Sequence, residues 1–189
     1  MLGGKAMQQV VFDVPYTEER NRLTTVFRII LAIPHLILYG LWNRVAQLAA
    51  VIQWFICVFT GKRNKAIWDF TLSAEAYGSR VGSYTGLLHD VWPPFFTEQG
   101  AVPSSYSLEY DESVNRLTTG LRIIWAIPAL IIMLVIGIGA FFVWIVSWFA
   151  ILFTGKHPRG MFDFLLKFQR FSLQTSAYTM LMTDTYPKY

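Results

Sequence analysis

Two long apolar stretches dominate the hydropathy pattern of the chain. They run from Leu23 to Thr60 and from Leu117 to Thr154, and the second contains a single charged residue, Arg122. A helix needs about 20 apolar residues to cross the hydrocarbon core of a bilayer. Each stretch is therefore long enough for two crossings.

Two crossings require a point at which the chain reverses direction. In the second stretch the Gly137-Ile138-Gly139 step fits this role, because glycine tolerates turn dihedral angles. Asn43-Arg44 occupies the equivalent break in the first stretch. The pattern predicts an all-α membrane protein built from two tandem transmembrane hairpins, with its four helices at residues 22–42, 45–60, 116–136 and 139–154.

The chain also repeats itself. Asn21-Arg22-Leu23-Thr24-Thr25 returns 94 residues later as Asn115-Arg116-Leu117-Thr118-Thr119, and Phe59-Thr60-Gly61-Lys62 returns at the same offset as Phe153-Thr154-Gly155-Lys156. Self-similarity at one fixed offset is the mark of a duplicated structural unit. We predict a first repeat at residues 10–97 and a second at 104–189.

Each repeat opens with a short segment of alternating polarity, Val10–Val14 in the first and Tyr106–Tyr110 in the second. A period of two predicts β-strands. Since an isolated strand is unstable, we expect the two to pair with each other, or with a strand of a partner chain, on the cytoplasmic side.

Residues 66–80 and 160–180, which follow the apolar stretches, have an amphipathic pattern. In the second segment aromatic side chains recur at helical spacing, with Lys167 and Arg170 on another face. This predicts helices that lie in the membrane interface. A third crossing per repeat is the alternative, although each cation would then cost about 2.5–3.5 kcal/mol near mid-bilayer.

Composition supports the membrane interpretation. Hydrophobic residues make up 54% of the chain and charged residues 15%, whereas soluble domains carry about 25% charged residues. Of the 16 lysines and arginines, only Arg44 falls at a predicted hairpin tip. The positive-inside rule then predicts a multi-pass protein of the bacterial inner (plasma) membrane with both termini in the cytoplasm. We expect no cleaved signal peptide; a very apolar soluble helical protein is the alternative.

Polar residues inside the apolar stretches are candidates for function. His35, Gln47 and Gln53 form a candidate intramembrane polar site, since an ionisable residue in a membrane helix often marks a transport path or a ligand contact. A neutral His35 that is hydrogen-bonded to a neighbouring helix is the structural alternative. Cys57 is expected to be a packed small hydrophobe.

Two arginines near the membrane face require partners. We expect structural ion pairs of Arg28 with Asp69 and of Arg122 with Asp163, because each carboxylate lies between aromatic residues at the start of an amphipathic segment. A polar substrate site at these positions is the alternative.

Basic residues are plentiful around the predicted membrane face. Each lysine or arginine close to an anionic leaflet contributes about 1 kcal/mol of attraction. We therefore expect contacts with anionic lipid headgroups, and no nucleic acid, from Lys62, Arg63, Lys65, Lys156, Arg159, Lys167 and Arg170. The sequence predicts no cofactor and no metal site, because no His, Cys, Asp or Glu pair has metal-ligand spacing.

A family resemblance rests on several of these segments. Asn21-Arg22-Leu23-Thr24-Thr25, Ala32-Ile33-Pro34-His35, Phe59-Thr60-Gly61-Lys62 and the run from Trp148 to Phe164 resemble the bacterial membrane family known as domain of unknown function 4389. Ala129 stands where the resemblance leads us to expect histidine, and Asn64 where it leads us to expect proline. The resemblance implies an integral membrane protein and brings no catalytic residues with it.

These observations predict a non-enzymatic membrane protein. We expect an accessory or scaffold subunit of a larger inner-membrane complex, in contact with anionic lipid, other membrane subunits and, in some assemblies, further copies of itself. A small oligomeric transporter or channel with a polar path near His35 is the alternative, and a membrane enzyme that acts on lipid is a third possibility.

Overall fold

The computed structural model describes residues 9–95 and 102–189 and is mainly helical. The elements are β1 (Val11–Asp13), α1 (Arg22–Thr60), α2 (Lys65–Thr85), β2 (Ser105–Ser107), α3 (Arg116–Gly120), α4 (Arg122–Thr154) and α5 (Arg159–Thr179).

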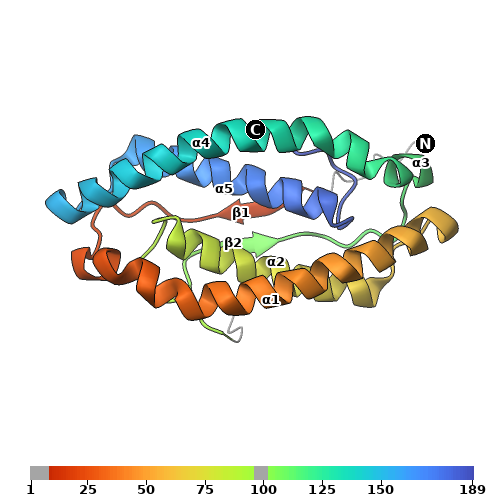
Figure 1. The fold of residues 1–189 in the computed structure, drawn as a ribbon, viewed down its shortest axis with the longest axis horizontal. Helices are drawn as coiled ribbons and strands as arrows, with labels where there is room; N and C mark the ends of the chain where they lie inside the picture. The colour runs from red at the N-terminus through yellow and green to blue at the C-terminus, as the bar shows by residue number, and fades with distance from the viewer. Residues whose placement is uncertain (1–8, 96–101) are drawn as a thin grey trace.

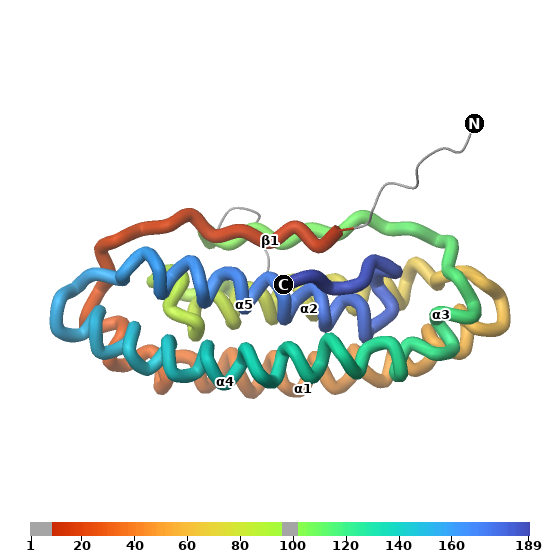
Figure 2. The backbone as a smooth tube through the Cα atoms, turned by 90° about the horizontal axis from the view of Figure 1, so that it is seen from above, coloured from red at the N-terminus to blue at the C-terminus, as the bar shows by residue number. Residues whose placement is uncertain are grey.

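The elements form three layers (Figure 2). The long helices α1 and α4 make one outer layer, α2 and α5 the middle layer, and the pair β1–β2 lies across the other side of the middle layer. The helices α1 and α4 run in opposite directions, converge toward their ends and bow apart between them (Figure 1). The molecule is therefore an elongated slab.

The prediction of a hairpin within each apolar stretch is wrong. Helix α1 continues without a break through Asn43 and Arg44, and α4 continues through Gly137 and Gly139. Two helices of the described chain are candidate membrane spans, instead of four. A Cβ at Gly137 would lie 3.5 Å from the ring of Phe168, an ordinary contact distance, so this position of α4 packs against α5 instead of forming a turn.

The chain reverses direction later, at the Phe-Thr-Gly-Lys segments. Gly61 and Gly155 follow α1 and α4, and each has φ +75°. This left-handed conformation ends a helix and suits glycine, which has no Cβ to clash. The real hairpins are therefore α1 with α2 and α4 with α5.

The predicted pairing of the two short strands is confirmed. The strands β1 and β2 are antiparallel, with Phe12 opposite Tyr106. These two residues are 94 positions apart and thus equivalent in the two repeats. A pseudo-two-fold axis therefore passes between them and through the three layers, relating α1 to α4 and α2 to α5.

The two predicted amphipathic segments are helical. Helices α2 and α5 pack in the middle layer, where they share a core with the strands. That core includes Phe12, Leu108, Trp68 and Phe162. The aromatic face that resembled an interfacial anchor is thus largely covered by the protein itself.

Each repeat is held in place by contacts with the other. The Tyr16 hydroxyl donates to the His157 carbonyl oxygen at 2.8 Å, and the equivalent Tyr110 hydroxyl donates to the Arg63 carbonyl oxygen, also at 2.8 Å. The exposed pair Lys156–Glu18, with 2.9 Å between Nζ and Oε1, joins the same segments. The segment that precedes the long helix of one repeat therefore holds the helix–helix turn of the other.

Candidate functional site

The outer layer exposes a large apolar surface. Along α1 it extends from Leu23, 68% exposed, to Phe59, 74% exposed, and along α4 from Ile123 to Phe153. The largest apolar patch of a soluble monomer is typically about 300–600 Å², and larger ones mark membrane or protein contacts. Here the exposed apolar residues cover both long helices from end to end.

Both long helices are long and apolar enough to span a membrane. In the most apolar windows of α1 and α4, only 22% and 11% of the residues are buried inside the protein. A core helix of a soluble protein would be mostly buried. The outer layer is thus the main candidate for contact with lipid.

Buried arginines fix both ends of the slab. The Arg28 side chain, 1% exposed, pairs with the Asp90 carboxylate, donates to the His89 carbonyl oxygen at 2.7 Å and stacks on the Tyr84 ring. Arg20 lies beside it, with Nη2 2.9 Å from the Leu88 carbonyl oxygen. The loop after α2 is thereby tied to the start of α1.

The other end repeats this arrangement with one exchange. Arg122 pairs with Asp184 and stacks on Tyr178, the residues equivalent to those around Arg28. The second guanidinium now comes from Arg63, whose Nη2 lies 2.6 Å from Asp184 Oδ1. Position 157, the equivalent of Arg63, is a histidine. Each end therefore holds two buried guanidinium groups near one carboxylate, supplied from different positions.

The structure does not form the ion pairs predicted from sequence. The carboxylates of Arg28 and Arg122 are Asp90 and Asp184, whereas Asp69 pairs with Lys65 at 2.7 Å and Asp163 with Arg159 at 3.8 Å. In each of these pairs the two residues are exposed and lie one helical turn apart. Because α2 begins beside the C-terminal end of α1, Asp69 lies far from Arg28, which is near the N-terminal end of α1. The 94-residue offset relates Asp90 to Asp184, but it also relates Asp69 to Asp163, so the repeat by itself did not single out the real partners.

The predicted intramembrane polar residues do not form one site. His35 is fully buried, with Nδ1 2.7 Å from the Tyr77 hydroxyl and its ring stacked on Phe95. Gln53 makes two hydrogen bonds with the backbone of Asn64. Its Nε2 donates to the Asn64 carbonyl oxygen at 3.3 Å, and the Asn64 N–H donates to Gln53 Oε1 at 3.1 Å. Gln47 is exposed on α1 and lines a separate groove.

Most of the basic residues predicted to contact headgroups are already paired within the protein. Lys62 pairs with Glu112, Lys65 with Asp69, Lys156 with Glu18, and Arg170 with Asp13 of β1. The Lys167 ammonium lies 4.1 Å from the centroid of the Tyr189 ring. Arg63 is different, because its side chain is buried and its guanidinium is enclosed by protein atoms. The prediction that Arg63 contacts headgroups is wrong.

A buried carboxylate that the sequence analysis missed lies in the middle layer. Glu75 of α2 is 1% exposed, and Ser176 of α5 donates to its Oε1 at 2.8 Å. Burial raises the pKa of Glu75 to about 7. Because the equivalent residue in the second repeat is Gln169, this site is not symmetric. Nothing in the local sequence pattern separates Glu75 from an exposed glutamate.

Two histidines are buried at the Arg28 end. The His89 Nε2 lies 2.9 Å from the Ser83 hydroxyl, and the His157 ring lies against Phe162. Burial is the main cause that lowers the pKa of each to about 4, and the positive charges of Arg20 and Arg28 act in the same direction. Both imidazoles are therefore neutral near pH 7.

Two grooves lie beside the long helices at symmetry-related positions. The α1 groove has a volume of about 450 Å³ and is lined by Asn43, Gln47, Ala50, Val51, Trp54, Phe55, Arg122, Ile123, Ser176, Thr179, Met180 and Leu181. The α4 groove, of about 460 Å³, is lined by Gly82, Thr85, Gly86, Leu88, Gly137, Ala140, Phe141, Trp144, Leu165, Phe168 and Gln169. Both volumes lie in the range of small-molecule sites.

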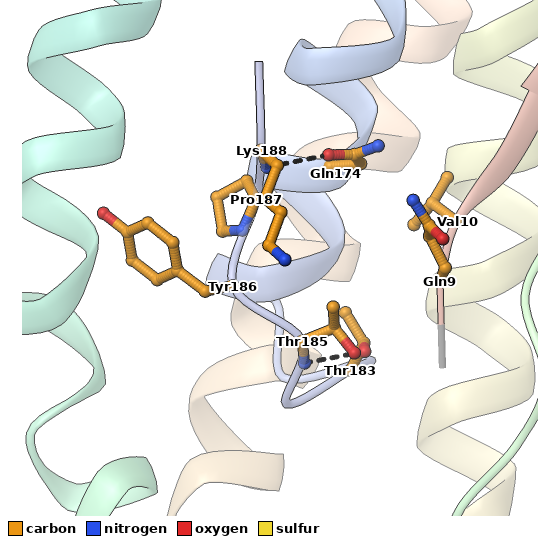
Figure 3. Close-up of a pocket in the computed structure, with 8 residues that line it drawn as sticks. All are labelled: Gln9, Val10, Gln174, Thr183, Thr185, Tyr186, Pro187 and Lys188. Carbon is orange, nitrogen blue, oxygen red and sulfur yellow. Dashed lines mark hydrogen bonds between the residues drawn. The ribbon is translucent and has the colours of Figure 1, made fainter. Parts of the chain in front are cut away.

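A smaller hollow of about 130 Å³ lies between the segment before β1 and the C-terminal segment (Figure 3). Gln9 and Val10 form one side, and the residues around Tyr186 form the other. The backbone N–H of Lys188 donates to Gln174 Oε1 at 3.0 Å, which holds the C-terminal segment on α5. We interpret this hollow as part of the packing of the chain end.

Comparison with known proteins identifies a family and no activity. No curated protein and no solved structure matches the chain. A model of the family described as a domain of unknown function, DUF4389, matches residues 22–97 and again residues 116–189. The two matches coincide with the two repeats related by the pseudo-two-fold axis. The chain therefore belongs to the DUF4389 family and contains two tandem copies of its domain.

Proposed function

We propose that this protein is a non-enzymatic membrane component that lies flat in one leaflet, with the α1–α4 layer in lipid and the strand layer in water. The observation that carries this proposal is that the exposed apolar side chains lie on one face of the molecule. The apolar surface covers one broad face over the full length of the slab, whereas β1 and β2 lie on the opposite side.

The length of α1 supports the flat arrangement. Its 39 residues extend about 58 Å at 1.5 Å per residue. This is about twice the 30 Å hydrocarbon core. A helix that lies along the interface can bury an apolar side of any length.

The position of the exposed ion pair Arg170–Asp13 supports it as well. The pair joins α5 to β1, and β1 lies near the middle of the long axis (Figure 1). The two side chains are 42% and 63% exposed. With α1 upright across the bilayer, these charges would face the hydrocarbon at mid-depth, at a cost of about 2.5–3.5 kcal/mol each. With the slab lying flat, they remain in water.

Labelling of single cysteines tests this orientation. In a Cys57→Ala background, Glu18→Cys and Lys62→Cys place thiols at opposite ends of α1, and both positions are exposed. The flat arrangement predicts that a membrane-impermeant maleimide labels both from the same side of sealed vesicles, while Leu48→Cys on the apolar face is protected. Labelling of the two ends from opposite sides would establish a spanning helix and overturn the proposal.

The biological role that we propose is that of an accessory or scaffold subunit of a larger inner-membrane assembly. A slab anchored through one face leaves its strand layer free for other subunits. Purification of tagged protein in mild detergent, followed by a native mass measurement, tests this role. A defined complex of fixed stoichiometry with other membrane proteins is expected, and a mass equal to one chain plus detergent would contradict it.

A further inference from the structure

We propose that the α1 groove is a binding site for one anionic phospholipid whose headgroup carries free hydroxyl groups. This inference rests on the proposed lipid contact of the α1–α4 layer and specifies it. The groove opens on that layer, because two of its lining residues, Phe55 and Ile123, are 51% and 77% exposed on the apolar face.

The two grooves have diverged in polarity. Asn43 and Gln47 line the α1 groove, and the equivalent positions in the α4 groove are Gly137 and Phe141. Both grooves keep a threonine in their lining, Thr179 in one and Thr85 in the other. The duplication thus provides an internal comparison. The α1 groove has two amide side chains on its long helix, whereas the α4 groove has none on α4 and one, Gln169, on α5.

Arg122 gives the α1 groove a positive end. This guanidinium is 3% exposed and uses Nη1 on the Thr183 carbonyl oxygen and Nη2 on Asp184. Its Nε has no hydrogen-bond partner among the described residues. Arg63 shares the same carboxylate, so two buried cations contact one anion here. An anionic oxygen would satisfy the remaining donor and the local charge.

Asn43 indicates the second feature of the ligand. Its Oδ1 is buried and has no donor within the described part of the chain. An unsatisfied buried acceptor destabilises the protein, and a hydroxyl donor from the ligand would remove this penalty. A phosphodiester with a glycerol headgroup supplies both the anionic oxygen and the hydroxyl. A phosphocholine headgroup has no hydroxyl and no net charge, while its acyl chains match the apolar walls equally well.

The test compares phosphatidylglycerol with phosphatidylcholine of identical acyl chains, added to delipidated protein and followed by native mass spectrometry. We expect one phosphatidylglycerol per chain to be held at least tenfold more tightly than phosphatidylcholine. The double variant Asn43→Ala, Gln47→Phe should abolish this preference. The matched control Phe141→Ala in the α4 groove should keep it. Equal retention of both lipids by the native protein, or an unchanged preference in the double variant, would overturn the site.

Flotation with vesicles of phosphatidylcholine alone separates this inference from the proposed function. Protein that floats with these vesicles but shows no headgroup preference would disprove only the groove site. Protein that does not float would disprove the lipid contact itself. The melting temperature of each variant in detergent verifies that a lost preference does not reflect unfolding.

Discussion

Phe12 and Tyr106 lie directly opposite each other in the antiparallel pair β1–β2, although 94 residues separate them in sequence. They are the same position of the two repeats, so the pseudo-two-fold axis passes between them. The pair closes the strand layer at the centre of the slab, and Phe12, 3% exposed, contributes to the core below.

This symmetry leads to a prediction about folding. Because the segments around Tyr16 and Tyr110 each bind the turn of the other repeat, neither repeat is expected to fold alone. Fragments 1–100 and 101–189 should associate when co-expressed in membranes, and each should be degraded when expressed singly. Co-purification through a tag on one fragment measures this association. A stable, monomeric single fragment would show that the repeats are independent domains.

Removal of the Asp184 carboxylate should be strongly destabilising. Asp184→Asn leaves Arg63 and Arg122 buried without a countercharge, and breaking a buried ion pair in this way costs about 3–5 kcal/mol. Asp163→Asn is the matched control, because it removes an exposed pair worth about 0.3–0.5 kcal/mol. Thermal unfolding in detergent should separate the two variants clearly. Similar melting temperatures would argue that the Asp184 cluster does not hold the fold.

Replacement of Glu75 should change how stability depends on pH. The folded-state pKa of about 7 is above the ordinary value of 4.5, so the folded protein retains a proton that the unfolded chain loses. Stability from this group is therefore complete below pH 4.5 and declines as the pH rises toward 7. Glu75→Gln, which installs the residue of the second repeat, should stabilise the protein at pH 8 and have little effect at pH 4.5. A shift of equal size at both pH values would exclude the buried carboxyl as its cause.

The two buried histidines predict that folding stability changes with pH in the opposite direction at lower pH. Their pKa values of about 4 lie below the ordinary value of 6.5, so below pH 6.5 the unfolded chain binds protons that the folded protein does not. Stability should fall as the pH drops from 6.5 to 4, by about 3 kcal/mol for each histidine. His89→Thr, which installs the equivalent Thr183, should reduce this acid sensitivity. Denaturant midpoints measured from pH 7 to pH 4.5 test the prediction, and an unchanged profile in the variant would contradict it.

The sequence by itself determined the duplication, the helical character and the family. Equal spacing of repeated segments depends only on residue identity, so the 94-residue offset located both copies and the strand partners. Helices at 65–85 and 159–179 were also predictable, because their apolar residues recur at helical spacing.

Tertiary structure alone decided where the chain turns and which charges meet. Asn43-Arg44 and Gly137-Ile138-Gly139 have the local chemistry of a break, but packing against α2 and α5 keeps both helices intact. Arg28 lies closer in sequence to Asp69 than to Asp90, yet the hairpin that begins at Gly61 carries Asp90 back to it. Hydropathy measures how apolar a segment is, not the direction in which its apolar face points. The difference between four short helices and two long helices with a shared apolar face therefore depends on how the helices pack.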